Sequence, residues 1–289
     1  MRTLTTICCL LLTACAAPMS SFHTGRTTPR NRVELMTGMG LNVASSFVSS
    51  VIDAGKTAAD KAKEAITQGQ TPTLSEDETR DLMQTAFAYG LLNPTPLWEL
   101  GLRYGILDRW DAGVAYTTSG FRFESRVQLL RENLSKAKPG QTRIPLDLSI
   151  GVQVMKLVFS IPIPDFLKDV FSIEDLSRLD LAVPVVLGRH FGQYGFVYGG
   201  PKFVYSFLQA DVLEKLSDLT GRTVTTDKGM WAVGGVVGGG IGYKYVFAVL
   251  ELNVLYYDYR PTILDTEVNL SGVNVYPALG LKVNFFSPG

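Results

Sequence analysis

The 289-residue sequence is poor in the side chains that most enzymes and metalloproteins depend on. It has only two histidines, His23 and His190, and two of its three cysteines, Cys8 and Cys9, lie within the first ten residues. It contains no His-Glu-x-x-His, no paired cysteine motif and no Gly-x-Ser-x-Gly. The glycine-rich run 233–242 lacks the spacing of a dinucleotide fingerprint. We therefore predict no catalytic residues, no metal site and no cofactor.

Long apolar runs and an excess of charge are missing as well. Beyond the first fifteen residues no stretch of eighteen apolar residues occurs, which excludes a transmembrane helix in the mature chain. The 27 basic and 27 acidic side chains balance, and this balance argues against a nucleic-acid partner.

The first fifteen residues have the form of an export signal, with one positive charge, Arg2, then an apolar core and small residues. The final four, Leu12-Thr13-Ala14-Cys15, resemble the lipobox of bacterial lipoproteins. The resemblance implies removal of residues 1–14 and acylation of Cys15, and Ala16 in place of aspartate implies delivery to the outer membrane. An ordinary secretory signal with a chance cysteine is the alternative. Residues 15–31 are polar, lack periodicity and are predicted to be a periplasmic tether.

Alternation with a period of two dominates residues 98–130. Trp98, Leu100, Leu102 and Tyr104 share one face of a predicted strand, whereas charged residues occupy the opposite face. A charged face cannot form a hydrophobic core, so the pattern is typical of a barrel with lipid outside and a polar interior. The predicted polar network of the lumen comprises Glu99, Arg103, Asp111, Arg122, Glu124, Arg126, Asp147, Asp180, Glu251 and Lys282.

We predict an all-β, antiparallel up-and-down transmembrane β-barrel over residues 32–289. An even strand number follows if the lipidated N-terminus and the last strand both face the periplasm; ten is expected and twelve is the alternative. The short turns at 107–109, 191–194 and 244–245 then face the periplasm, and the long connections carry short extracellular helices. One of these is a helical insertion at 44–81, whose helix 45–67 we expect to plug the lumen. The ten predicted strands are 32–43, 98–106, 110–117, 121–130, 145–156, 178–190, 195–207, 230–243, 246–258 and 271–286.

Aromatic residues and the C-terminus favour the same architecture. Trp98, Trp110 and Trp231 fall near predicted strand starts, where an aromatic belt at the membrane interface requires them. Gly280, Val283 and Phe285 resemble the signal that the barrel assembly machinery reads, although Ala278 replaces a polar residue and three residues follow Phe286. The run ELGLRYGILDRWDAGVAY resembles a group of uncharacterised bacterial outer-membrane barrel proteins, a resemblance that implies no particular activity.

The sequence therefore predicts a lipid-anchored outer-membrane barrel of structural or transport type, with a narrow or plugged pore. Its expected partners are outer-membrane lipid, the assembly machinery during biogenesis, and a small solute or an extracellular partner at the loops. An outer-membrane enzyme with a loop-borne site and a soluble periplasmic β-rich lipoprotein remain alternatives.

Overall fold

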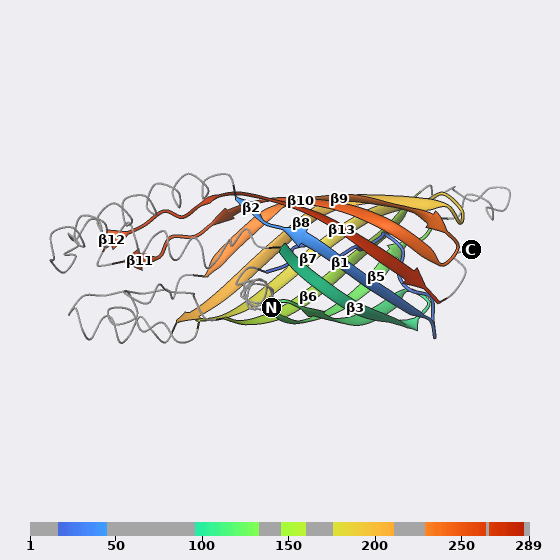
Figure 1. Ribbon diagram of the computed structural model, residues 1–289, viewed down its shortest axis with the longest axis horizontal. Coiled ribbons are helices and arrows are strands. Elements are labelled where there is room, and N and C mark those ends of the chain that lie inside the picture. The colour runs from blue at the N-terminus through green and yellow to red at the C-terminus, as the bar shows by residue number, and fades with distance from the viewer. Residues whose placement is uncertain are drawn as a thin grey trace, which may run out of the picture.

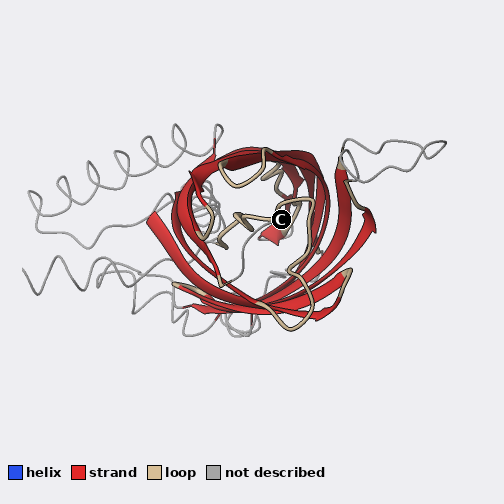
Figure 2. Ribbon diagram, turned by 90° about the vertical axis from the view of Figure 1, so that its right-hand side faces the viewer, coloured by secondary structure: helices blue, strands red, loops and turns tan. Residues whose placement is uncertain are grey.

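The computed structural model describes residues 17–44, 96–132, 146–159, 176–210, 229–263 and 266–285. Within these ranges ten antiparallel strands form a closed barrel, seen from the side in Figure 1 and along its axis in Figure 2. The predicted fold class and the predicted strand number are confirmed. The ten strands are β1 (Val33–Leu41), β3 (Pro96–Leu107), β4 (Trp110–Thr117), β5 (Gly120–Leu130), β6 (Asp147–Phe159), β7 (Leu176–His190), β8 (Gly195–Ala210), β9 (Met230–Tyr243), β10 (Val246–Asp258) and β13 (Gly272–Asn284).

Each strand pairs with its neighbour in the chain, and the first and last strands close the ring. In the closing pair Gly38 of β1 lies opposite Gly280 of β13. The short strand β2 (Val43–Ala44) extends the same edge of β13, and β11 (Thr262–Ile263) pairs with β12 (Thr266–Glu267) in a separate hairpin. Because the ring closes, none of the ten strands leaves an unpaired backbone edge along its central part.

Short turns join consecutive strands at one end of the barrel, which we call the short-turn end. These turns connect β3 to β4, β7 to β8 and β9 to β10. The opposite end, the long-connection end, carries the connections β1–β3, β6–β7 and β8–β9. The helical insertion predicted at 44–81 begins at Ala44 in β2 and otherwise lies outside the described residues, as do the helix 45–67 and the other helices predicted for these connections. Among the residues described, no helix is long and apolar enough to cross a membrane.

The two faces of the wall have opposite chemistry. Side chains that point outward are large and apolar, such as Leu102 at 46% exposure, Phe123 at 60% and Leu250 at 66%. Their neighbours in the sequence point inward and are polar, such as Arg103 at 1% and Glu124 at 5%. This arrangement is the reverse of a soluble domain, whose buried face is apolar, and it is the pattern of a barrel surrounded by hydrocarbon.

Candidate functional site: the occupied lumen

The lumen is occupied by residues Ala17–Pro29, which we call the N-terminal segment. Every residue from Ala17 to Thr28 is buried except Arg26, which is partly exposed. The segment immediately precedes β1 and appears in Figure 1 as the blue chain inside the barrel outline. The prediction that these residues form a periplasmic tether is wrong. Their polar composition, which suggested a solvated linker, instead complements the polar inner wall.

The segment runs along the lumen from one end towards the other. At the short-turn end, the Asn31 amide donates to the Gly105 carbonyl at 2.8 Å, and the Thr28 amide donates to Asp111 at 2.7 Å. Ser20 lies farther along, where its hydroxyl donates to Glu99 at 2.6 Å and its carbonyl accepts from Arg122 at 2.7 Å. Glu99 and Arg122 lie near those ends of β3 and β5 that face the long connections. The segment therefore extends from Pro29, at the short-turn end, to its earlier residues nearer the long-connection end.

Carboxylates and an amide of the wall accept hydrogen bonds from the backbone of the segment. Glu251 accepts from two consecutive amides, that of Ser21 at 2.9 Å and that of Phe22 at 2.7 Å. Gln128 accepts from the Thr27 amide at 3.4 Å and from its hydroxyl at 3.0 Å. These contacts supply partners for amides that have no sheet neighbour, because the segment is not a strand of the barrel.

Cationic side chains of the wall donate to the carbonyls of the segment. Lys202 donates to Met19 at 2.6 Å, Arg103 to Ser21 at 3.2 Å and Arg126 to Thr24 at 3.1 Å. Since a buried peptide group without a partner costs roughly 1–3 kcal/mol, this set of donors and acceptors holds the segment in one register. The wall thus binds the segment through its backbone.

Buried ion pairs connect the wall residues to one another. Arg103 donates to Glu34 and to Glu124, both at 2.6 Å, and Lys282 lies 2.9 Å from the other oxygen of Glu34. His23 of the segment joins the network through its Nε2, which lies 3.0 Å from Glu124. Three further pairs are Arg122 with Glu99, Arg126 with Asp111, and Arg178 with Asp180.

The N-terminal segment adds positive charge to a lumen wall that is richer in buried carboxylates than in buried cations. Among the described residues, seven buried carboxylates face six buried lysine and arginine side chains. Arg26 of the segment, which is partly exposed, adds a further cation that lies 3.2 Å from the buried Asp147 and 3.4 Å from the partly exposed Glu132. Removal of the segment would therefore leave the wall with a net negative charge.

Phe22 anchors the segment by its shape. Its φ angle is 46°, a left-handed conformation that side chains other than glycine rarely adopt and that costs about 1–3 kcal/mol. The ring lies against Gly38 and Gly280 of the closing strand pair, where a Cβ added to Gly38 would approach it to 2.4 Å and one added to Gly280 to 2.9 Å. The absence of side chains at these two glycines therefore creates the space that the ring fills.

All ten residues predicted to form the lumen network are buried, each with 5% or less of its surface exposed. Eight of them contact the N-terminal segment directly: Glu99, Arg103, Asp111, Arg122, Glu124, Arg126, Asp147 and Glu251. The other two pair within the wall, Asp180 with Arg178 and Lys282 with Glu34.

Sequence reasoning missed other residues of the same site. Glu34, Arg178 and Lys202 are buried and polar but lie outside the predicted network, whereas Gln128 and Gln153, which the period-two pattern places on the inner face, are buried there. Glu34 and Lys202 alternate with apolar neighbours, so the same pattern applied to β1 and β8 would have identified them. The contacts of Ser20, Phe22 and Thr28 carry no such signal, because the segment has no periodicity.

The predicted belt residues lie near the ends of strands, and the predicted assembly residues lie in β13 or directly after it. Trp98 and Trp110 are 39% and 38% exposed, near the long-connection end and the short-turn end respectively. Trp231 packs against Tyr256, with ring centroids 5.9 Å apart and the rings tilted by 57°. In the predicted assembly signal, Gly280 and Val283 belong to β13, and Phe285 directly follows it with 60% exposure. Cys15 lies outside the described residues.

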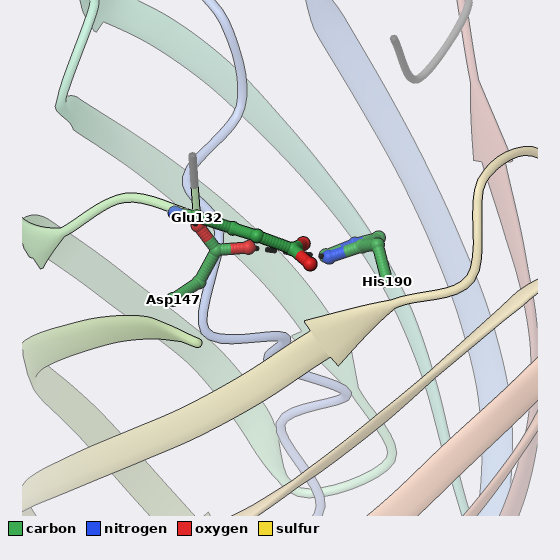
Figure 3. A group of neighbouring side chains, drawn as sticks. All are labelled: Glu132, Asp147 and His190. Carbon is green, nitrogen blue, oxygen red and sulfur yellow. Dashed lines mark hydrogen bonds and ion pairs between the residues drawn. The ribbon is translucent and has the colours of Figure 1, made fainter. Parts of the chain in front are cut away.

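A second group of polar side chains lies where the segment enters the lumen. Glu132, Asp147 and His190 each place one potential ligand atom within 4.8 Å of the others, and Figure 3 shows the three side chains converging. No metal site was predicted at His190. The three residues lie in or just after β5, β6 and β7, so their proximity depends on the pairing of these strands. The guanidinium of Arg26 also contacts both carboxylates.

The sequence matches no family profile and no curated protein. Among solved structures, the outer membrane protein OprG from Pseudomonas aeruginosa aligns over 92% of this chain and 100% of its own, with 10% identity and a TM-score of 0.34. Neisserial surface protein A aligns over 88% and 96%, with 9% identity and a TM-score of 0.31. The outer membrane protease OmpT from Escherichia coli aligns over 90% and 98%, with 9% identity and a TM-score of 0.30.

Proposed function

We propose that this protein is a lipid-anchored barrel of the bacterial outer membrane whose pore is closed by its own N-terminal segment. The observation that carries the proposal is the set of hydrogen bonds by which the inner wall holds Ala17–Pro29 in the lumen. The apolar outer face supports the membrane location, because large side chains such as Leu250 and Phe123 require hydrocarbon around them.

A plug explains the polar lumen better than a solely structural role does. A lumen needed only for structural support could be filled by wall side chains that pair with one another, as barrels of about eight strands are. Here Glu251 and Asp111 instead direct oxygen atoms at amides of the segment. A segment held by hydrogen bonds and continuous with β1 only at Arg30–Arg32 can leave the lumen without breaking the barrel, which is the property of a gate.

Conductance in planar bilayers tests the plug. The chain beginning at Ala17 should be silent, and a chain beginning at Arg30 should show stable channels, because removal of the segment empties the lumen. Addition of a synthetic peptide with the sequence of residues 17–30 should reduce the current, whereas a scrambled peptide of the same composition should not. Stable conductance from the chain that retains the segment, or silence from the folded shortened chain, would contradict the proposal.

The membrane location and the anchor have separate tests. A folded membrane barrel in the outer-membrane fraction should migrate differently on a gel before and after boiling. The substitution Cys15→Ala should abolish acylation, measured by the mass of the mature protein, while the barrel stays in the membrane. A single acyl chain gives only marginal binding, so the barrel itself is expected to hold the protein there. Recovery of the unacylated variant as a soluble periplasmic protein would refute the membrane barrel.

A further inference from the structure

The group Glu132, Asp147 and His190 has the ligand chemistry of a site for a divalent transition metal. Two carboxylates and one imidazole suit Zn²⁺ or Mn²⁺, whose ligand atoms lie about 2.0–2.2 Å from the ion. The three potential ligand atoms lie within 4.8 Å of one another, so small side-chain movements would bring them to a common ion.

Neighbouring residues position these ligands. Oδ1 of Asp147 accepts from Gln128 at 2.8 Å and from the Glu132 amide at 2.9 Å, which leaves Oδ2 facing the centre of the group. Nδ1 of His190 lies 3.4 Å from that oxygen, and the imidazole packs against the ring of Phe196 with centroids 5.6 Å apart. Orientation of metal ligands by surrounding hydrogen bonds and packing is typical of protein metal sites.

When the N-terminal segment occupies the lumen, the positive charge beside Glu132 and Asp147 is that of Arg26. Its Nε lies 3.2 Å from Asp147 Oδ2, and its Nη2 lies 3.4 Å from Glu132. Charge-assisted hydrogen bonds between such groups are usually about 2.7–2.9 Å long, so these two contacts are long. Arg26 is also the most exposed residue between Ala17 and Thr28, since it lies at the mouth of the short-turn end.

We propose that Glu132, Asp147 and His190 form a divalent-metal site that competes with Arg26 for the same two carboxylates. A metal ion bound there displaces Arg26 and weakens the attachment of the N-terminal segment where the segment enters the lumen. The competition is reciprocal, because any ligand that binds only the released state shifts the equilibrium towards that state. This coupling to the gate rests on the proposed function, whereas the binding site itself does not.

Binding of Co²⁺ and Zn²⁺ to the purified barrel in detergent tests the site. Co²⁺ is the spectroscopic probe, because its visible absorption changes on coordination by nitrogen and oxygen ligands, and titration calorimetry with Zn²⁺ gives the affinity. Arg26→Ala should bind one Zn²⁺ at least tenfold more tightly than the unaltered chain. Arg32→Ala removes an exposed arginine outside the group and serves as the matched control, with unchanged affinity.

Ligand variants decide whether the three residues are responsible. In the Arg26→Ala background, His190→Ala and Asp147→Asn should each abolish the Co²⁺ signal and weaken Zn²⁺ binding at least tenfold, with folding monitored by the gel shift of unboiled protein. Equal affinity in Arg26→Ala and the unaltered chain, or a Co²⁺ signal that survives both ligand substitutions, would overturn the proposal. If Asp147→Asn does not fold, His190→Gln provides the same test.

Conductance measured with and without Zn²⁺ tests metal binding and pore opening separately. If Zn²⁺ raises channel opening in the unaltered chain but not in His190→Ala, both the site and its coupling are supported. If Zn²⁺ binds as predicted and both the full and the shortened chain are silent, the plug hypothesis fails while the metal site stands. If Zn²⁺ binds and leaves a working gate unchanged, the competition with Arg26 is refuted.

Discussion

The inner and outer faces of the same strands place very different demands on their residues. Leu102 and Arg103 are neighbours on β3, yet Leu102 is 46% exposed on the outside and Arg103 is 1% exposed on the inside. The outer residue needs only to be apolar, since hydrocarbon makes no directional contacts. The inner residue bonds to Glu34, Glu124 and the Ser21 carbonyl, so its length, charge and geometry all matter. The outer face therefore determines where the barrel resides, and the inner face determines what the lumen holds.

The largest effect on this comparison is expected from the inner face. Arg103→Ala would leave Glu34 and Glu124 buried with fewer cationic partners, and loss of one member of a buried ion pair costs about 3–5 kcal/mol. We expect the free energy of unfolding in phospholipid vesicles to fall by about that amount, measured by urea titration. Arg109→Ala, at an exposed position in the turn between β3 and β4, should change it by less than about 0.5 kcal/mol. Equal effects from the two substitutions would show that the network does not stabilise the barrel.

A smaller effect is expected from the outer neighbour. Leu102→Arg places a charge in hydrocarbon, and near the middle of the bilayer this costs about 2–4 kcal/mol. The same urea titration measures it, and Leu102→Ile is the control because it keeps the face apolar. A tolerated arginine at this position would mean that the outer face meets water, as the soluble alternative requires.

The smallest effect on stability, but the most specific one, concerns Glu251. Glu251→Gln removes the charge that strengthens two hydrogen bonds from the segment, and hydrogen bonds to charged groups contribute about 1.5–3 kcal/mol. We expect the segment to leave the lumen more often, so that brief channel openings appear in bilayer recordings. Asp180→Asn removes the charge of another inner carboxylate, which bonds to Arg178 and not to the segment, and it provides a comparison for loss of charge alone. Unaltered silence in Glu251→Gln would show that these two bonds do not keep the pore closed.

The sequence was sufficient for the wall because its alternation is a direct record of which side each residue faces. Ten strands could be placed within a few residues of their bounds, as for the strand predicted at 246–258 and observed as β10, Val246–Asp258. The short turns limited the errors in the predicted strand bounds. The turn at 244–245, for example, leaves little choice in how β9 and β10 pair.

The contents of the lumen could not be predicted in the same way. The conformation of Ala17–Pro29 depends on contacts with wall residues such as Glu99 and Glu251, which are 79 and 230 positions away from Ser20 and Ser21. Phe22 adopts a left-handed conformation that no propensity scale favours. The Glu132, Asp147 and His190 group likewise depends on the register that sets Asp147 opposite Gly188.

The direction of the N-terminal segment in the lumen constrains which membrane leaflet could hold the lipid proposed at Cys15. Cys15 stands two positions before Ala17, a separation of at most about 7 Å in an extended chain. Ala17 is buried, and Ser20, three positions later, bonds to Glu99 near the long-connection end. In a closed barrel, acyl chains attached at Cys15 would therefore enter the bilayer near the long-connection end, and not at the periplasmic short-turn end where the sequence places the lipidated N-terminus; an anchor at the short-turn end would pull the segment out. A lipid in the leaflet at the long-connection end would then indicate a closed pore, and a lipid in the leaflet at the short-turn end an open one.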